Sequence, residues 1–539
     1  MIRKRLKQLS LSLILTPLLL FPGTGRGWDV ISKPAPPTSP LTGVTQTLLA
    51  LISQEDKTKI NADDYQSTSL KQLITLGTPA GYRLKLRYLE FGISLVEGLK
   101  ISRDPELRKR LIEHVQWARR PKVRAEAILS LAGFSDPTHK KYIKEALLDS
   151  DIGIRFAAVE ALQIWGQPEA INLLKLAMGR DWSPLMQIVA AQALLSLGDK
   201  SGLPALYAGL DNDSWVIRAM AARYLGDYGK PDDYENLISH LRRENRNDFV
   251  IAEMSIAALK LISKKGEKVY YSPTEPGWRD NEEVSFTLGK DNVVEMEPLV
   301  IVPPRLRIPE SLQLAAEINN QLLNLIRNRL SEKLDPIQAQ DPVVAELNSM
   351  ETPGGFALKV RYSELSYLVI EGLGGTRDLL VRIELEKMAQ ENPNPLVRAS
   401  ALITLAYSKD DRTIGLIQDA LTHPNAIVRF GAMEAIEVGR FTDAVPSLLS
   451  IANMDVSPAL RVYAMQVMAR FGNPSGRYML MAATGDQDWP ARAMAFWYLG
   501  RFGSPDDYNL VLNKLPMETN PFVQAEICLG ILRLAPLEQ

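Results

Sequence analysis

Apolar positions recur with a helical period along most of the chain. Between residues 154 and 165 one apolar stripe runs at helical spacing, formed by Ile154, Ala157, Ala158, Ala161, Leu162 and Trp165. Small side chains in such a stripe let two helices approach closely. Helices of this kind return about every 31 residues. A period in this range predicts an all-α fold, an α-solenoid built from helical hairpins.

Each recurring helix opens on a similar short sequence, usually with an arginine. The openings lie at residues 123–125, 154–156, 185–187, 217–219 and 250–252, and again at 397–399, 428–430, 460–462, 491–493 and 523–525. The recurring arginines include Arg124, Arg155, Arg218, Arg398, Arg429 and Arg492. They could line a concave groove. We favour a structural role, because charges that recur with a repeat usually serve the repeat.

The chain is also a tandem duplication. The segment Trp215–Tyr234 returns as Trp489–Tyr508, and this 274-residue offset holds without a gap from about Leu48 to Leu241. We expect one array over residues 41–262 and a second over 311–539. Each array exceeds the roughly three repeats that a solenoid needs for a continuous core. Cutting the chain between them is therefore expected to remove at most one interface.

Other signals refine this outline. Residues 263–310 are rich in proline, and two β-like runs at 284–288 and 293–296 predict a short β-hairpin in an insert between the arrays. One helix is expected from Leu84 to Leu99, with a twin from Leu358 to Leu373. Glycines are expected where helices end, at Gly198, Gly226, Gly229, Gly472, Gly500 and Gly503.

The repeated helices resemble a known family. Residues 146–162 combine an acidic turn with Ile154-Arg155-Phe156-Ala157-Ala158, and residues 420–436 repeat this arrangement. In this the sequence resembles HEAT repeats, most closely the short HEAT-like repeats of the phycobilisome-lyase type, over residues 80–262 and 350–536. The resemblance implies the fold and leaves the partner open, because this fold serves many functions.

The amino terminus has the layout of a secretory signal. Basic residues precede the apolar run Leu9–Phe21, small residues follow, and a proline-rich linker occupies residues 28–40. We expect residues 1–27 to be removed, the mature chain to begin near Arg26 or Trp28, and the protein to be exported to the periplasm or cell envelope. Peripheral membrane association stays open. The single cysteine, Cys528, excludes an intramolecular disulfide.

Composition argues against several functions. The 62 basic and 63 acidic residues give a net charge of −1, whereas a nucleic-acid binder needs a surplus of Lys and Arg. The four histidines have no ligand-like spacing, and the signatures of hydrolases, phosphate loops and zinc proteases are missing. We expect no cofactor and no metal, and interpret the protein as a non-enzymatic scaffold for a protein or peptide partner.

Candidate contact residues come from equivalent helices of the two copies. Aromatic and arginine side chains dominate binding hot spots, and six such residues are proposed as partner-binding: Arg218, Arg223, Tyr224, Arg492, Trp497 and Tyr498. Arg223 and Trp497 occupy the same aligned position, and such variation favours a partner-facing site. We expect contact along the second helices of successive repeats. The alternative is a bilin-lyase-like or other enzyme with a pocket between the arrays.

A second polar set recurs at the start of each array. Its members are Lys85, Arg87, Tyr88, Glu90 and Glu97 in the first copy, and Lys359, Arg361, Tyr362, Glu364 and Glu371 in the second. It could form a polar site. We favour a salt-bridged cap that covers the first repeat.

Overall fold

The computed structural model describes most of the chain as helices. It covers residues 42–54, 66–102, 104–134, 136–244, 247–266, 269, 310–329, 338–350, 352–363, 365–376 and 378–535. The predicted signal segment, the proline-rich linker and the predicted β-hairpin lie outside the described residues. In the part of the chain that is described, no helix is both long and apolar enough to cross a membrane.

Both copies form helical hairpins. The helices of the first array are α2 (Thr42–Gln54), α3 (Thr68–Thr75), α4 (Pro79–Leu89), α5 (Phe91–Ile101), α6 (Pro105–Trp117), α7 (Pro121–Ala132), α8 (Lys140–Ala146), α9 (Ile152–Trp165), α10 (Pro168–Arg180), α11 (Pro184–Ser196), α12 (Leu203–Gly209), α13 (Trp215–Tyr228), α14 (Asp233–Leu241) and α15 (Asp248–Lys264). Those of the second array are α16 (Glu310–Arg329), α17 (Pro342–Asn348), α18 (Pro353–Ser363), α19 (Leu365–Leu373), α20 (Leu379–Glu391), α21 (Pro395–Tyr407), α22 (Thr413–Leu421), α23 (Ala426–Gly439), α24 (Leu448–Met454), α25 (Pro458–Arg470), α26 (Pro474–Ala483), α27 (Trp489–Phe502), α28 (Tyr508–Lys514) and α29 (Pro521–Leu534).

The helix ends follow the sequence signals in part. Ser183 caps α11 by accepting a hydrogen bond from the Met186 N–H, and Pro184 occupies the first helical position. Gly198 follows the same helix in the left-handed region, with φ of 85°. The prediction is wrong for Gly226 and Gly500, which lie inside α13 and α27.

Those two glycines allow close helix contacts instead. A Cβ on Gly226 would lie 2.7 Å from the Cα of Ala257, and one on Gly500 would lie 2.8 Å from the Cα of Gly530. The predicted apolar stripe of α9 is buried throughout, and both Ala158 and its twin Ala432 have no exposed surface. Small residues therefore set the spacing between successive helices of the stack.

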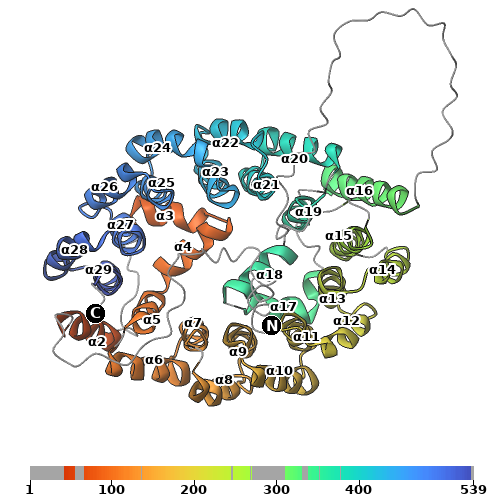
Figure 1. Cartoon of the computed structure of the whole chain (residues 1–539), viewed down its shortest axis with the longest axis horizontal. Coiled ribbons are helices and arrows are strands. Elements are labelled where there is room, and N and C mark those ends of the chain that lie inside the picture. Colours follow the sequence, from red (N-terminus) through yellow and green to blue (C-terminus); the bar gives the residue numbers. More distant parts are fainter. Residues whose placement is uncertain are drawn as a thin grey trace, which may run out of the picture.

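The two arrays curve into a single ring (Figure 1). One layer of helices lines the outside, including α6, α8, α10, α20, α22 and α24, and the second helix of each hairpin lies inside it. At one junction α29 packs on α5 and α2, and at the other α15 packs on α19 and α16. The two arrays thus share two interfaces. The expectation that cutting the chain between them removes at most one interface is therefore wrong.

Two helix pairs fill the ring interior. Helices α3 and α4 of the first array lie against α25 and α27 of the second, while α17 and α18 lie against α11, α13 and α9 (Figure 1). The prediction of a single helix from Leu84 to Leu99 is wrong. The chain breaks at Glu90, which has extended backbone, and Glu90 pairs there with Arg120 and Lys122. The break lets α4 leave the stack and reach the opposite array.

Candidate functional site

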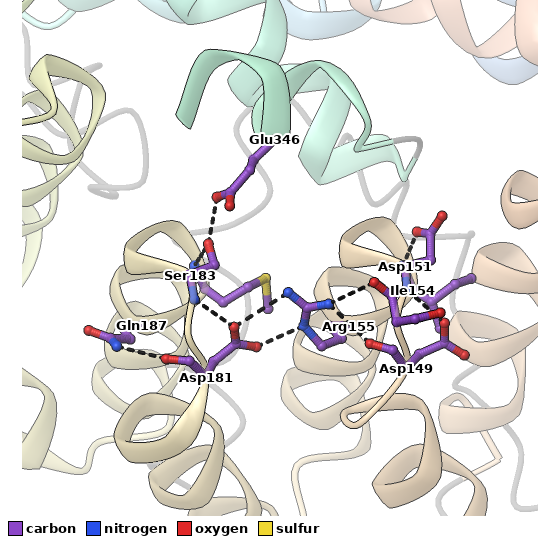
Figure 2. Close-up of polar contacts among 10 residues, drawn as sticks. Asp149, Asp151, Ile154, Arg155, Asp181, Ser183, Gln187 and Glu346 are labelled. Atoms are coloured by element: carbon purple, nitrogen blue, oxygen red, sulfur yellow. Dashed lines mark hydrogen bonds and ion pairs between the residues drawn. The ribbon is translucent and has the colours of Figure 1, made fainter. Parts of the chain in front are cut away.

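The recurring arginines connect successive repeats. Arg155 donates from Nε to Asp181 at 2.8 Å and from Nη1 to the carbonyl oxygens of Asp149 and Ser150 (Figure 2). Its pair with Asp181 is almost fully buried. Asp149 and Asp181 belong to successive turns between an outer helix and the next inner helix. The arginine therefore fixes the distance between neighbouring turns.

The same contact recurs in both arrays. Five further arginines pair with an acid of the following turn, in the pairs Arg124–Asp149, Arg218–Glu244, Arg429–Asp455, Arg461–Asp486 and Arg492–Glu518. Arg398 differs, because its Nε donates to the carbonyl oxygen of Ala389 at the end of α20. Where arginine is missing, Gln187 and Gln524 donate to the carbonyl oxygens of Asp181 and Glu518 (Figure 2). These contacts support the structural interpretation of the ladder, and they account for the predicted anchors Arg218 and Arg492.

The other four predicted anchors lie at the two junctions between arrays. Tyr224 and Tyr498 are buried, and Arg223 and Trp497 are half-buried. Trp497 has the guanidinium of Arg87 over its ring at 4.4 Å. The difference between Arg223 and Trp497 was expected to mark a partner-facing position. Both residues lie at the junctions instead, so the difference distinguishes one junction from the other.

The first junction, the closing seam, joins α4 and α5 to α27 and α29; its residues are Arg87, Glu97, Trp497, Arg501, Glu526 and Arg533. Arg87 binds Glu526 through two hydrogen bonds of 2.5 and 2.7 Å and also pairs with Glu97. Glu97 in turn pairs with Arg533. Because Arg87 and Glu526 are both buried, their bidentate pairing offsets part of the cost of removing two charges from water.

The second junction, the linked seam, joins α18 and α19 to α13 and α15; its residues are Arg223, Asp227, Glu253, Lys260, Arg361 and Tyr362. Arg361 binds Glu253 through hydrogen bonds of 2.5 and 2.9 Å, and the Tyr362 hydroxyl donates to the same carboxylate at 3.0 Å. Both arginines of the predicted polar cap thus form salt bridges, as that interpretation requires, but their buried partners Glu526 and Glu253 belong to the opposite array.

Helix caps also meet across the arrays. The Ser214 hydroxyl, which precedes α13, donates to Asp341, the cap of α17, at 2.7 Å. The equivalent contact in the other half exchanges the residues, because the Ser67 hydroxyl at the start of α3 donates to Asp488 before α27. Donor and acceptor have changed places between the copies while the hydrogen bond is kept.

Two buried carboxyl groups face the interior helices. Glu434 on α23 accepts a hydrogen bond from the Ala80 N–H at 3.0 Å, and Glu160 on α9 has an equivalent position opposite Thr352 and Gly354. Burial raises the pKa of Glu160 to about 8 and that of Glu434 to about 7, although hydrogen bonds from α18 and α4 lower both. One oxygen of each carboxyl group has no hydrogen-bond partner among the described residues.

A row of exposed apolar side chains lies on one face of the ring. We call it the apolar rim, and it consists of Trp117, Leu148, Trp182, Met454, Val456 and Met517. Each lies at a turn from an outer to an inner helix, and the ladder contacts show that successive turns are neighbours. Trp117, Trp182 and Val456 are each more than 70% exposed.

The apolar rim covers only part of the ring. Its turns follow α24, α28, α6, α8 and α10, which lie on both sides of the closing seam (Figure 1). The turn after α26, between the first two, exposes no large apolar side chain. There the starts of α29 and α5 meet through Phe522 and Phe91, with ring centroids 4.9 Å apart. At the described turns after α12, α14, α20 and α22 no large apolar side chain is exposed. Exposed apolar side chains gathered at neighbouring turns are typical of a contact surface.

A small pocket opens at the start of the second array, between α20 and the ends of α19 and α21. Its walls include Leu373, Leu385 and Thr404, and Arg382, Ser408 and Asp410 provide the polar lining. The sequence interpretation missed both this pocket and the apolar rim. A signal for the rim existed, because Trp117 and Trp182 stand just before an inner-helix start, where a solvent-facing turn is expected to be polar.

Metal ligation has no support in the described part of the chain, where no group of three or more His, Cys, Asp or Glu side chains is placed to hold an ion. Cys528 is buried, and burial raises the pKa of its thiol to about 12. A buried, protonated thiol is a poor nucleophile.

Comparisons with known proteins identify the repeats. A family model described as HEAT repeats matches residues 105–194, 173–260, 384–456 and 445–531, which together span more than half of the chain. The match is to HEAT repeats in general and leaves the phycobilisome-lyase type unconfirmed. No curated protein gives a significant match. A solved structure of human deoxyhypusine hydroxylase in complex with glycerol is similar, with 16% identity, 68% of this chain and 96% of that chain covered, and a TM-score of 0.24. The chain belongs to the HEAT-repeat family.

Proposed function

We propose that this protein is an exported, non-enzymatic scaffold that binds a protein or peptide partner through the apolar rim. The observation behind the proposal is the exposure of six large apolar side chains at five outer-to-inner turns in one part of the ring, three of them successive, after α6, α8 and α10. Water-exposed apolar area of this extent is costly unless a partner covers it. Tryptophan is also among the residues most enriched in binding hot spots.

This surface differs from the one expected from the sequence. The inner helices were expected to form the contact, but α3, α4, α17 and α18 already lie against several of them. The predicted anchors are used within the ring, either in the ladder or at the seams. The turns before the inner helices remain accessible, and the ladder holds them at fixed spacing. A partner would meet a preorganised row of side chains, which lowers the entropic cost of binding.

The test is partner capture with variants of the rim. Trp117→Ser combined with Trp182→Ser removes the two largest rim side chains, and Tyr478→Ser combined with Ile164→Ser removes exposed side chains away from it. Affinity purification from a periplasmic fraction, followed by mass spectrometry, should yield one stoichiometric protein with the wild type and the control. The rim variant should lose that protein. Retention of the partner by the rim variant would contradict the proposal.

The same purification tests the remaining parts of the proposal. A copurifying chromophore or small-molecule product would favour the alternative, an enzyme of the bilin-lyase or another type. Export is tested by amino-terminal sequencing of the native protein, which should begin near Arg26 or Trp28. An intact Met1 on a cytosolic species would remove the export proposal and leave the binding proposal standing.

A further inference from the structure

The pocket of the second array has a filled counterpart in the first. At the 274-residue offset, Arg382 corresponds to Arg108, Ser408 to Phe134 and Thr413 to His139. In the first array the Arg108 guanidinium lies over the Phe134 ring at 4.7 Å, and the same ring makes an edge contact with His139 at 5.9 Å. The first array therefore holds an aromatic ring of its own beside this arginine.

In the second array the ring has been replaced by a hydroxymethyl group. Ser408 and Arg382 both line the open pocket. The nearest aromatic residue in sequence, Tyr407, is not among the residues that line it. Loss of the phenyl group thus leaves a space bounded by Arg382, Leu385 and Leu405, beside an arginine equivalent to one that stacks on an aromatic ring in the other copy.

The bonding of Arg382 limits what this space can accept. Its Nε donates to Glu386 at 2.7 Å, and Nη1 pairs with Asp410 at 3.0 Å. Weaker contacts of 3.5 and 3.4 Å lead to the hydroxyl groups of Ser408 and Thr413. These four residues, of which Ser408 and Asp410 line the pocket, occupy the edge of the guanidinium, so an occupant of the pocket would meet its planar face. The face of an arginine favours an aromatic ring.

The mouth of the pocket is apolar. Leu379, Leu380 and Ile383 on α20 are 60%, 59% and 48% exposed. The equivalent positions in the first array are Pro105, Glu106 and Lys109. The copy with the open pocket has therefore also exchanged a polar helix surface for an apolar one, which extends the contact area beyond a single ring.

We propose that this pocket binds an aromatic side chain of a partner polypeptide, with the ring stacked on Arg382 and the flanking residues covering Leu379, Leu380 and Ile383. In the first array, the ring of Phe134 beside Arg108 shows the proposed arrangement of aromatic ring and guanidinium. That the partner is a polypeptide rests on the proposed scaffold function. The site itself is separate from the apolar rim and is tested without the native partner.

The probe is p-cresol, the side chain of tyrosine, observed by saturation-transfer NMR with the full-length protein. Wild type should transfer saturation to the ring protons. Ser408→Phe copies the first array, fills the pocket and should reduce the transfer at least about five-fold. Phe134→Ser opens the equivalent space and should increase it. Unchanged transfer in both variants, or no transfer to the wild type, would overturn the proposal.

Further variants keep the test independent of folding defects and of the rim. Leu379→Asp changes an exposed residue at the pocket mouth and should weaken p-cresol binding, whereas Leu449→Asp, at an exposed position on α24, should not. A capped pentapeptide with one central tyrosine should compete with p-cresol. If p-cresol binds and the peptide does not compete, the occupant is a free aromatic molecule and the polypeptide assignment is wrong. The Trp117→Ser and Trp182→Ser variant should bind p-cresol normally, so failure of partner capture alone would concern only the proposed function.

Discussion

The two seams of the ring share one architecture and differ in how their charges are connected. In the linked seam Lys260 pairs with Asp227 at 2.7 Å, and both belong to the first array. In the closing seam the equivalent residues are Arg533 and Arg501, so the acidic partner is replaced by a second arginine. Arg533 pairs instead with Glu97 of the opposite array. The second arginine thus leaves Arg533 without the acid that pairs with Lys260 in the linked seam, and its described partner is Glu97 across the closing seam.

The difference follows the path of the chain. At the linked seam the sequence runs from α15 to α16 and keeps the two arrays near each other. The closing seam joins the first described helix, α2, and α5 to the last helix, α29, which lie at opposite ends of the sequence. The Arg533–Glu97 ion pair strengthens there a contact that chain connectivity supports less directly. The predictions below use this comparison, from the largest expected effect to the smallest.

Separating the arrays should have the largest effect. Residues 28–266 and 310–539, produced as two chains, each lose the partners of both seams, including the carboxylates that neutralise Arg87 and Arg361. Each fragment alone should be less stable than the full chain and expose apolar surface, and a mixture should form a 1:1 complex. Circular dichroism and analytical ultracentrifugation provide the measurement. Two fragments that melt cooperatively and do not associate would show that the arrays are independent after all.

Removal of a buried carboxylate should be the most damaging single substitution. Glu526→Ala and Glu253→Ala each leave a buried arginine without its main partner, and each should lower the free energy of unfolding by about 3–5 kcal/mol. Replacing Arg87 and Glu526 together with methionine should recover much of the loss, because no uncompensated charge remains. Urea denaturation measures all three variants. Equal midpoints for the single and double variants would contradict this account of the seam.

The two buried carboxyl groups predict a pH dependence. The folded pKa of Glu160, about 8, lies above its ordinary value of 4.5, so its contribution to stability is present below pH 4.5 and is lost as the pH rises toward 8. At about 1.4 kcal/mol per pKa unit, Glu160→Gln should reduce the fall in stability between pH 5 and 8 by on the order of 3–4 kcal/mol. Glu434→Gln should reduce the fall in stability in the same way, over the narrower range from pH 5 to 7. The control Glu169→Gln, at an exposed position, should leave the pH profile unchanged.

The exchanged helix caps allow a reciprocal test. Ser214→Asp places a carboxylate against Asp341 and should cost about 1 kcal/mol through like-charge repulsion. Adding Asp341→Ser recreates the arrangement of Ser67 and Asp488 and should restore the stability. The melting temperatures of the single and double variants provide the measurement. A double variant as unstable as the single one would mean that the two halves are not interchangeable at this position.

The smallest expected effect concerns the ion pair that differs between the seams. Arg533→Met should weaken the closing seam by at most about 1 kcal/mol, because the Arg533–Glu97 pair is partly exposed and screened by solvent. Lys260→Met removes the ion pair with Asp227, within the first array, and should weaken the association of the two arrays less than Arg533→Met does. Association of the separate fragments, measured by calorimetry, distinguishes the two variants. Equal losses of affinity would remove the proposed difference between the seams.

The local features of the fold could be predicted from the sequence because they depend on residues close together in the chain. The apolar stripe of α9, the serine and proline at the start of α11 and the glycine after it act within one or two turns of helix. The structural role of the ladder arginines could also be predicted, since Arg124, Arg155, Arg218, Arg429 and Arg492 each pair with an acid of the next repeat. Gly226 was misassigned because its role depends on Ala257 of a neighbouring helix rather than on its own.

The sequence by itself determined that this chain is a duplicated array of HEAT-like helical hairpins, because period and capping are local and repeated. Only the tertiary structure decided that the arrays close into a ring, that α4 and α18 cross to the opposite array, and that Tyr224 and Tyr498 lie buried at the seams. Those outcomes depend on the accumulated curvature of many repeats and on pairs such as Arg87 and Glu526, which are separated by 439 residues. No local pattern records which distant side chain will neutralise a buried charge.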